Sequence, residues 1–237
     1  MNPRGEFLSA LFRILEEHSV PYCVQRNYEN IYAESDSDID LAVEPEHVAS
    51  LNECLAKAAV TANYRLIQSA RYVNYSHVFS PPAGASHSTP DPRHSGLLRV
   101  DVETEIRWRC FPILSAKAII GLRRRLEAFY IPHPRHESII LLAAAIWRSY
   151  LSDRYREQLA RLYPQVPNPE ELRRTFRSAF GSCGDDLAAL QASGHNRVSS
   201  VECRGEALCG TRHFRHARFR GRVKHFKAPA QLIQSLP

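Results

Sequence analysis

The chain has 237 residues, a formal net charge of +6, and 44% hydrophobic against 24% charged residues, which is ordinary for a globular protein of one large or two small domains. No apolar run reaches the roughly 18 residues that a membrane span needs, and the N-terminus does not have the pattern of a signal peptide. The six cysteines form no C-x-x-C pair, which argues against a zinc site or a disulfide framework, and we expect a cytoplasmic protein with reduced thiols.

The first eighty residues alternate between helix and strand patterns. Apolar residues recur at helical spacing over residues 6–17, which predicts an amphipathic helix. Short strands are expected over residues 20–25 and 37–43, and in the second of these polar and apolar residues alternate at period two. Residues 45–60 open with Pro and Glu and predict a helix, whereas residues 64–80 are rich in Tyr and Val and predict two strands or one bent strand.

The pattern changes after residue 80. Residues 81–96 form a loop by composition, and residues 97–109 alternate again, which predicts another strand. The segment from residue 168 has an Asn cap, a Pro at the first helical position and a Gly at its end, which is typical of a helix. We expect the second half to be helical over residues 114–130, 137–162, 168–181 and 185–194.

This layout predicts an α/β (α+β) domain with a mixed sheet over residues 1–112, a helical domain over residues 113–195, and a basic tail or linker over residues 196–237. The tail has seven Arg and two Lys against two Glu, a net charge of +7, so the body before it is near neutral. Its mixture of cations and Phe can bind nucleic acid or an anionic surface, but we favour a solvated linker.

The most informative segment is "SDIDLAV", residues 37–43. Asp38 and Asp40 are two apart on a strand and project to the same side, where carboxylates repel one another unless a cation or a basic partner holds them. The segment is therefore either a solvated strand end or a metal site. Asp101, in the middle of the strand predicted over residues 97–109, is the candidate for a third carboxylate. Such a set suits Mg²⁺ (or Mn²⁺), which takes hard oxygen ligands.

"SDIDLAV" followed by a helix, with "LRVDVE" roughly sixty residues later, resembles the DNA polymerase beta-like nucleotidyltransferase superfamily. The motif of that superfamily is a glycine-serine turn, then S-D-x-D-[LI], then a later strand Asp. "VQRNYENIYAESDSDIDLAV" and "IPHPRHESIILLAAAIW" are similar to segments of nucleotidyltransferase-like domains encoded in bacterial polysaccharide and natural-product gene clusters. The resemblance covers residues 20–163.

The resemblance implies a nucleotidyltransferase-fold mixed sheet with flanking helices, and an enzyme that transfers a nucleoside monophosphate from an NTP to a small-molecule acceptor. The acceptor group would be a hydroxyl or phosphate of a sugar or natural product, and the reaction would depend on Mg²⁺. Asp38 and Asp40 would be metal ligands, Asp101 a third ligand and general base, and Ser37 would lie beside the site.

The chain departs from the superfamily pattern where the glycine-serine turn should hold the γ-phosphate, because "QRNYEN" stands there instead. Arg26 can offer a guanidinium fork to phosphate, with Asn27 as a polar contact, or it can form a structural ion pair with Glu29 or Asp36. Asp36 and Glu34 are otherwise expected to cap the turn.

Two other functions remain open. The missing turn supports a catalytically degenerate protein that binds a nucleotide or a partner, and the basic tail supports an RNA-binding or RNA-modifying protein. We favour a small acceptor over nucleic acid because the body carries no evident basic channel. Glu103 and Glu105 are expected to face water or to pair with Arg99 and Arg107.

Overall fold

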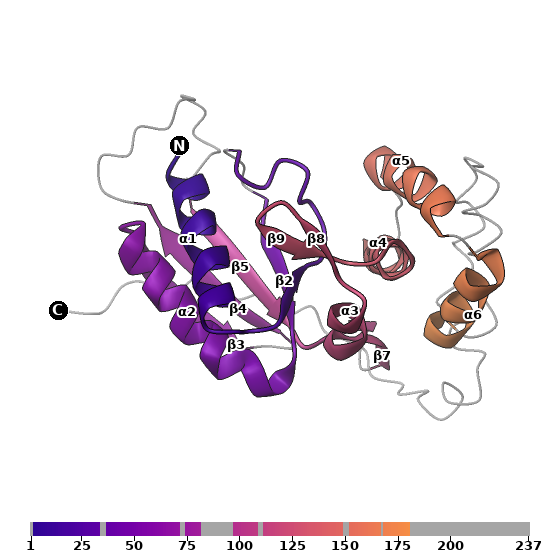
Figure 1. The fold of residues 1–237 in the computed structure, drawn as a ribbon, viewed down its shortest axis with the longest axis horizontal. Helices are drawn as coiled ribbons and strands as arrows, with labels where there is room; N and C mark the ends of the chain where they lie inside the picture. The colour runs from indigo at the N-terminus through magenta and orange to yellow at the C-terminus, as the bar shows by residue number, and fades with distance from the viewer. Residues whose placement is uncertain are drawn as a thin grey trace, which may run out of the picture.

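The computed structural model describes residues 2–33, 37–71, 74–81, 97–108, 111–148, 152–166 and 168–180. These residues form an α+β fold built on a five-stranded mixed sheet of order β1-β2-β5-β4-β3, with two separate two-stranded sheets, β6-β7 and β8-β9 (Figure 1). The predicted fold class is therefore confirmed.

The strands are β1 (Tyr22–Val24), β2 (Ile39–Val43), β3 (Arg65–Arg71), β4 (Tyr75–Ser80), β5 (Leu98–Glu103), β6 (Glu105–Trp108), β7 (Phe111–Ser115), β8 (Arg124–Leu126) and β9 (Phe129–Ile131). The α-helices are α1 (Pro3–Glu17), α2 (Val48–Thr61), α3 (Ala116–Gly121), α4 (Pro134–Arg148), α5 (Asp153–Leu162) and α6 (Pro169–Phe180). Two single 3₁₀ turns, η1 (Pro45–His47) and η2 (Tyr163–Gln165), precede α2 and follow α5.

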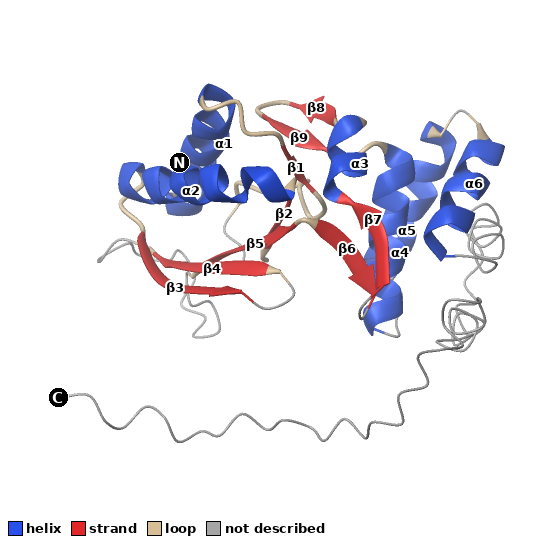
Figure 2. Ribbon diagram, turned by 90° about the horizontal axis from the view of Figure 1, so that it is seen from below, coloured by secondary structure: helices blue, strands red, loops and turns tan. Residues whose placement is uncertain are grey.

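The centre of the main sheet is the parallel pair β2 and β5, and the pairs β1–β2, β5–β4 and β4–β3 are antiparallel. Parallel strands need a long connection between them. The segment between β2 and β5 contains η1, α2 and the β3–β4 hairpin, and it returns the chain to the end of the sheet at which β2 begins. Helices α1 and α2 cover one face of this sheet (Figure 2).

The main hydrophobic cluster lies between that face and the two helices. Alternate residues of the central strands point into it, and Ile39, Leu41, Val100 and Val102 are all buried there. From α1, Phe7 packs against Phe79 and Tyr64, and Phe12 stacks on Tyr22 and Phe129. The helix begins where it does because Pro3 follows Asn2, whose side chain accepts a hydrogen bond from the Gly5 backbone.

A second hydrophobic cluster joins α3–α6 to the other face of the sheet. Cys23 of β1 and Ala42 of β2 are buried in it together with the apolar residues of α4. The chain passes from one cluster to the other at Thr104, because Val102 belongs to the first and Ile106 to the second. Figures 1 and 2 both place α4–α6 together, away from α1 and α2.

Three predictions of secondary structure are wrong. Residues 137–162 are not one helix, because α4 ends at Arg148 and α5 begins after Ser152, whose backbone is extended and whose side chain caps α5. Residues 97–109 do not form one strand, because the change of cluster at Thr104 ends β5 at Glu103, and β6 pairs instead with β7. Residues 114–130 are not one helix: α3 ends at Gly121, and the β8–β9 hairpin follows. Glu127, with a φ of 51°, turns this hairpin so that Phe129 and Ile131 reach the first cluster.

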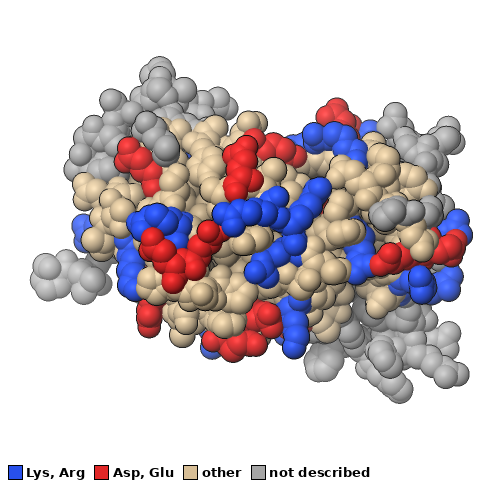
Figure 3. Space-filling view, viewed as in Figure 1, with Lys and Arg blue, Asp and Glu red and all other residues tan. Residues whose placement is uncertain are grey.

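Several predictions lie outside the described residues, among them the cap formed by Glu34 and Asp36, most of the loop 81–96, the helix over residues 185–194 and the tail 196–237. The domain boundaries stay a prediction. Within the described ranges, no helix is long and apolar enough to cross a membrane. On the face seen in Figure 3, basic and acidic side chains are interspersed.

Candidate functional site

The three predicted aspartates lie at the centre of the main sheet. Asp40 of β2 and Asp101 of β5 are register partners across the parallel pair, so their side chains leave the sheet on the same face. Asp38 precedes β2 by one residue and lies two residues before Asp40. The intervening apolar residues point to the opposite face, into the first cluster. Because side chains alternate between the two faces of a strand, the carboxylates of both segments lie on the same face of the main sheet. This is the face that packs against α3–α5.

Arg26, directly beyond β1, forms a bidentate ion pair with Asp40. Its Nε donates to Asp40 Oδ2 at 2.7 Å and its Nη2 to Oδ1 at 3.2 Å, while Nη1 donates to the hydroxyl of Tyr155 on α5 at 3.4 Å. Asp40 is only 3% exposed. Burial disfavours the charged guanidinium, but the hydrogen bond to Asp40 and its charge outweigh that effect and raise the pKa of Arg26. Of the two predicted alternatives for an ion pair, Glu29 pairs with Arg154 and Arg161 instead, and Asp36 lies outside the described residues.

Arg99 of β5 holds the other two aspartates. Its Nε donates to Asp101 Oδ1 at 3.0 Å, and its Nη1 lies 3.8 Å from Asp38 Oδ2. Burial raises the pKa of the Asp38 carboxyl, Arg99 opposes the rise, and Asp101 and Asp40 add to it. Asp38 and Asp101 are therefore connected through one guanidinium on this face of the sheet.

Glu103 is a fourth carboxylate on this face, and the prediction that it faces water is wrong. It is 6% exposed and accepts hydrogen bonds from Gln25 Nε2 at 3.2 Å and from Asn74 Nδ2 at 2.9 Å. Burial raises its pKa to about 7, and the charge of Asp40 contributes to the rise. The reason is its register: Glu103 pairs with Ala42, which is covered by the second hydrophobic cluster. Glu105, by contrast, pairs with Arg107 as expected.

Asn27 and Ser37 are sequence neighbours of Arg26 and Asp38. Asn27 follows Arg26 with a φ of 60°, a left-handed conformation that Asn tolerates better than most residues. The backbone therefore turns sharply at the place where the superfamily pattern has its glycine-serine turn. Ser37 accepts a hydrogen bond from Arg4 Nη2 through its carbonyl, at 2.9 Å, which fixes the chain just before Asp38.

Sequence reasoning missed Gln25, Asn74 and Tyr155 as members of this site. Gln25 is 1% exposed at the end of an apolar strand, and a buried amide there is a signal that a polar partner is needed. Asn74 and Tyr155 give no such signal in the sequence, since their partners lie 29 and 129 residues away along the chain.

The side chains of this face fit a divalent cation in their chemistry, although no group of three or more His, Cys, Asp or Glu in the described ranges is arranged to hold one as it stands. Asp38, Asp40, Asp101 and Glu103 face two arginines, so the acidic groups are in excess. A cation would offset the repulsion that raises the pKa of Asp38. Asp40 would have to release at least one oxygen from Arg26 to become a ligand.

No match to this chain was found among protein-family models or among curated proteins.

Proposed function

We propose that this protein is a Mg²⁺-dependent nucleotidyltransferase that transfers a nucleoside monophosphate from an NTP to a hydroxyl or phosphate of a small acceptor, a sugar or natural product. The observation that supports this most is the register of the parallel strands, which sets Asp40 directly beside Asp101. With Asp38 two residues earlier, three carboxylates from two strands share one face. Carboxylates gathered in this way could hold the cation of a metal-assisted phosphoryl transfer.

In this reaction an acceptor oxygen attacks the α-phosphorus, the bond from that phosphorus to the bridging oxygen breaks, and pyrophosphate leaves with the bonding electrons. Asp38, Asp40 and Asp101 would hold the cation, which when bound neutralises the triphosphate and acidifies the attacking hydroxyl. Within the described residues Asp101 accepts one hydrogen bond, from Arg99 to Oδ1, so its Oδ2 would be available to take the acceptor proton.

Arg26 would have two partners in succession. In the free protein its planar guanidinium donates two hydrogen bonds to the Asp40 carboxylate, and the same bidentate geometry suits a phosphate. Binding of an NTP with its cation would then replace the Asp40 carboxylate on Arg26 with a phosphate, and Asp40 would become free to hold the cation. The Arg26 contact with Tyr155 connects this exchange to α5.

The test is to incubate the protein with each NTP, Mg²⁺ and a panel of sugars and sugar phosphates, and to measure pyrophosphate. We expect release that falls at least about a hundredfold in Asp40→Asn and in Asp101→Asn, since each substitution removes a charged ligand. Asp153→Asn is the matched control, because Asp153 is 80% exposed on α5, and it should leave the rate unchanged. No release with any NTP and acceptor would reject the proposal.

A second candidate is a degenerate relative that binds a nucleotide without chemistry. It is favoured by the Arg26–Asp40 fork, which occupies both oxygens of the central ligand. Titration with Mn²⁺ followed by electron paramagnetic resonance separates the two, because a catalytic site must bind the cation through Asp40. Binding of NTP with no cation uptake, in both the parent and Asp40→Asn, would support the degenerate protein.

A further inference from the structure

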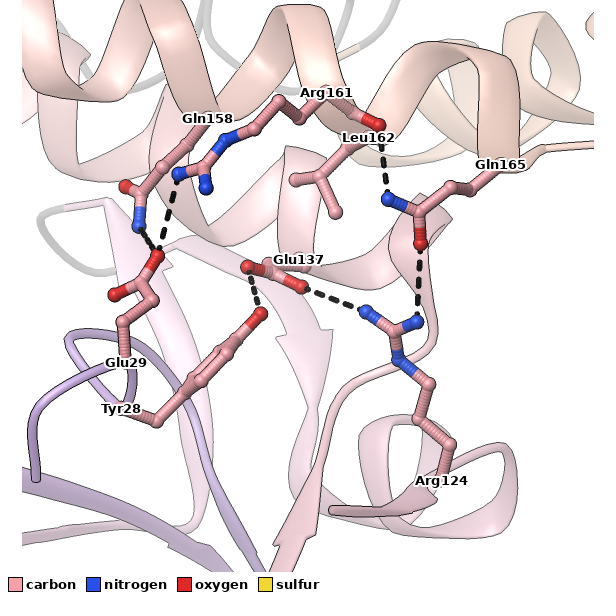
Figure 4. A pocket seen from close by; sticks show the side chains of 8 residues that line it. All are labelled: Tyr28, Glu29, Arg124, Glu137, Gln158, Arg161, Leu162 and Gln165. Carbon is pink, nitrogen blue, oxygen red and sulfur yellow. Dashed lines mark hydrogen bonds and ion pairs between the residues drawn. The ribbon is translucent and has the colours of Figure 1, made fainter.

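A pocket of about 130 Å³ lies beside helices α4 and α5 (Figure 4). Its walls are the turn after β1 with Tyr28 and Glu29, Arg124 of β8, Glu137 of α4, and one face of α5. At about 30 Å³ per water molecule, its volume corresponds to a few waters and is well below the roughly 300–1,000 Å³ of pockets for drug-sized ligands. It can therefore take up one edge of a sugar ring, with the rest of the ring outside the pocket.

Glu137 lies at the centre of this pocket and is only 2% exposed. Its Oε1 accepts a hydrogen bond from the Tyr28 hydroxyl at 2.6 Å. Its Oε2 lies 3.7 Å from Arg124 Nη2, too far for a hydrogen bond, and accepts none from the described residues. A buried carboxylate oxygen without a donor is costly, so the pocket offers an acceptor site to a ligand.

The arginines of the pocket keep donors available. Arg161 donates only a long 3.4 Å bond to Glu29, whose carboxylate also accepts from Gln158 at 2.6 Å. Arg124 donates through Nη1 to Gln165 and through Nε to the carbonyl of Pro132. Each guanidinium has five N–H groups, so both retain hydrogens that no hydrogen bond of the described residues uses.

Glu29 pairs with both Arg161 and Arg154, and Glu137 lies beside Arg124, so basic side chains are in slight excess around the pocket. An ammonium ligand would be repelled by these arginines, and a phosphate would have to displace Glu29 or Glu137 from them. A hydroxyl group both donates and accepts, so it can satisfy Glu137 Oε2 and a guanidinium N–H without disturbing either pair. The Tyr28 ring and Leu162 add apolar surface for the face of a ring.

From this arrangement we propose that the pocket binds a neutral, hydroxyl-rich ligand with the dimensions of a monosaccharide. The pocket adjoins the carboxylate face of the sheet: Tyr155, which contacts Arg26, and Gln158 are one turn apart on α5. The binding of a sugar in this pocket does not depend on the proposed function. Only the further step, that the bound sugar is the acceptor of the transfer, rests on it.

The test is saturation-transfer NMR on the full-length protein with D-glucose, D-galactose and D-mannose, in the absence of nucleotide and divalent metal. We expect binding of at least one sugar, and a roughly tenfold loss of affinity in both Glu137→Gln and Arg161→Ala, because each removes one charge-assisted hydrogen bond. Arg161 is 65% exposed, so its truncation leaves the core intact.

Arg173→Ala is the matched control, since Arg173 is a similarly exposed helical arginine on α6 in an ion pair with Glu170, and it should bind as the parent does. Sugar binding that is equal in the parent and Arg161→Ala would overturn the proposal, as would no binding of any sugar. Saturation transfer to methylammonium, or phosphate binding seen as ³¹P line broadening, in place of sugar binding would also overturn it. Because no nucleotide is present, this result is independent of whether pyrophosphate is released in the transfer assay.

Discussion

The carboxylate face of the sheet and the pocket beside it each contain a buried carboxylate next to an arginine, and the two pairs differ in geometry. Arg26 meets both oxygens of Asp40 at hydrogen-bonding distance, whereas Arg124 approaches only one oxygen of Glu137, at 3.7 Å. Glu137 takes its hydrogen bond from a neutral hydroxyl instead. Full pairing favours the ionised form of a carboxylate, and partial pairing leaves burial as the larger effect.

This difference in pairing affects the pKa of the two glutamates that lack a full ion pair, Glu137 and Glu103. Burial raises the pKa of Glu137 to about 7, and the hydrogen bond from Tyr28 and the charge of Arg124 only limit the rise. Glu103, held by two amides, also has a pKa raised by burial to about 7. Both glutamates therefore have a pKa near neutral pH, whereas Asp40 has a permanent cation as its partner.

The largest effect is expected from breaking the fully paired carboxylate. Arg26→Met leaves Asp40 buried without its cation and should lower the free energy of unfolding by about 3–5 kcal/mol, measured by urea denaturation. The double variant Arg26→Met/Asp40→Asn should recover part of this loss, because the uncompensated charge is gone. Arg13→Met, which removes an exposed pair with Glu17, should cost less than about 1 kcal/mol. Equal decreases in the free energy of unfolding in Arg26→Met and Arg13→Met would show that the buried pair stabilises no more than the exposed one.

An intermediate effect is expected from Glu137. Its folded pKa lies above the value of about 4.3 of an unfolded chain, so the native state binds more protons between about pH 4 and pH 7. Its contribution therefore makes the protein less stable as pH rises through this window, by on the order of 2 kcal/mol. Glu137→Gln should gain stability relative to the parent between pH 5 and pH 8.

The difference between Glu137→Gln and the parent is the quantity to measure, because His136 acts in the opposite direction. Burial lowers the pKa of His136 to about 4, so the contribution of His136 to the stability of the folded protein increases as pH rises. Thermal or urea denaturation at several pH values gives the difference directly. A difference that stays constant from pH 5 to pH 8 would show that Glu137 does not titrate in this range and would contradict the prediction.

The smallest effect concerns Asn27, which lies between the two regions in the sequence. Arg26 on one side turns to Asp40 and Tyr28 on the other turns to Glu137, and the left-handed φ of 60° at Asn27 allows both. Asn27→Ala should cost about 1 kcal/mol, whereas Asn27→Gly should be nearly neutral. Amide chemical shifts should change around both Asp40 and Glu137 in Asn27→Ala. Equal costs for Ala and Gly would argue against backbone strain.

Local patterns in the sequence predicted the elements whose burial follows a simple period. The apolar spacing of residues 6–17 corresponds to α1, and the alternation of residues 37–43 corresponds to β2. The Asn-Pro start of α6 is confirmed by the hydrogen bonds that Asn168 accepts from the backbone of Glu170 and Glu171. Where packing overrides local preference, as in residues 122–131, a predicted helix became a hairpin.

The sequence by itself determined that Asp38 and Asp40 share one side of a strand and that Asp101 stands in the middle of another, because a strand repeats every two residues. Only the tertiary structure decided that Asp40 and Asp101 are neighbours, that Arg26 holds Asp40, and that Glu103 is buried. It also created the pocket around Glu137, whose lining comes from segments more than a hundred residues apart. Strand order and the packing of the helices on the sheet set these contacts, and no local periodicity encodes them.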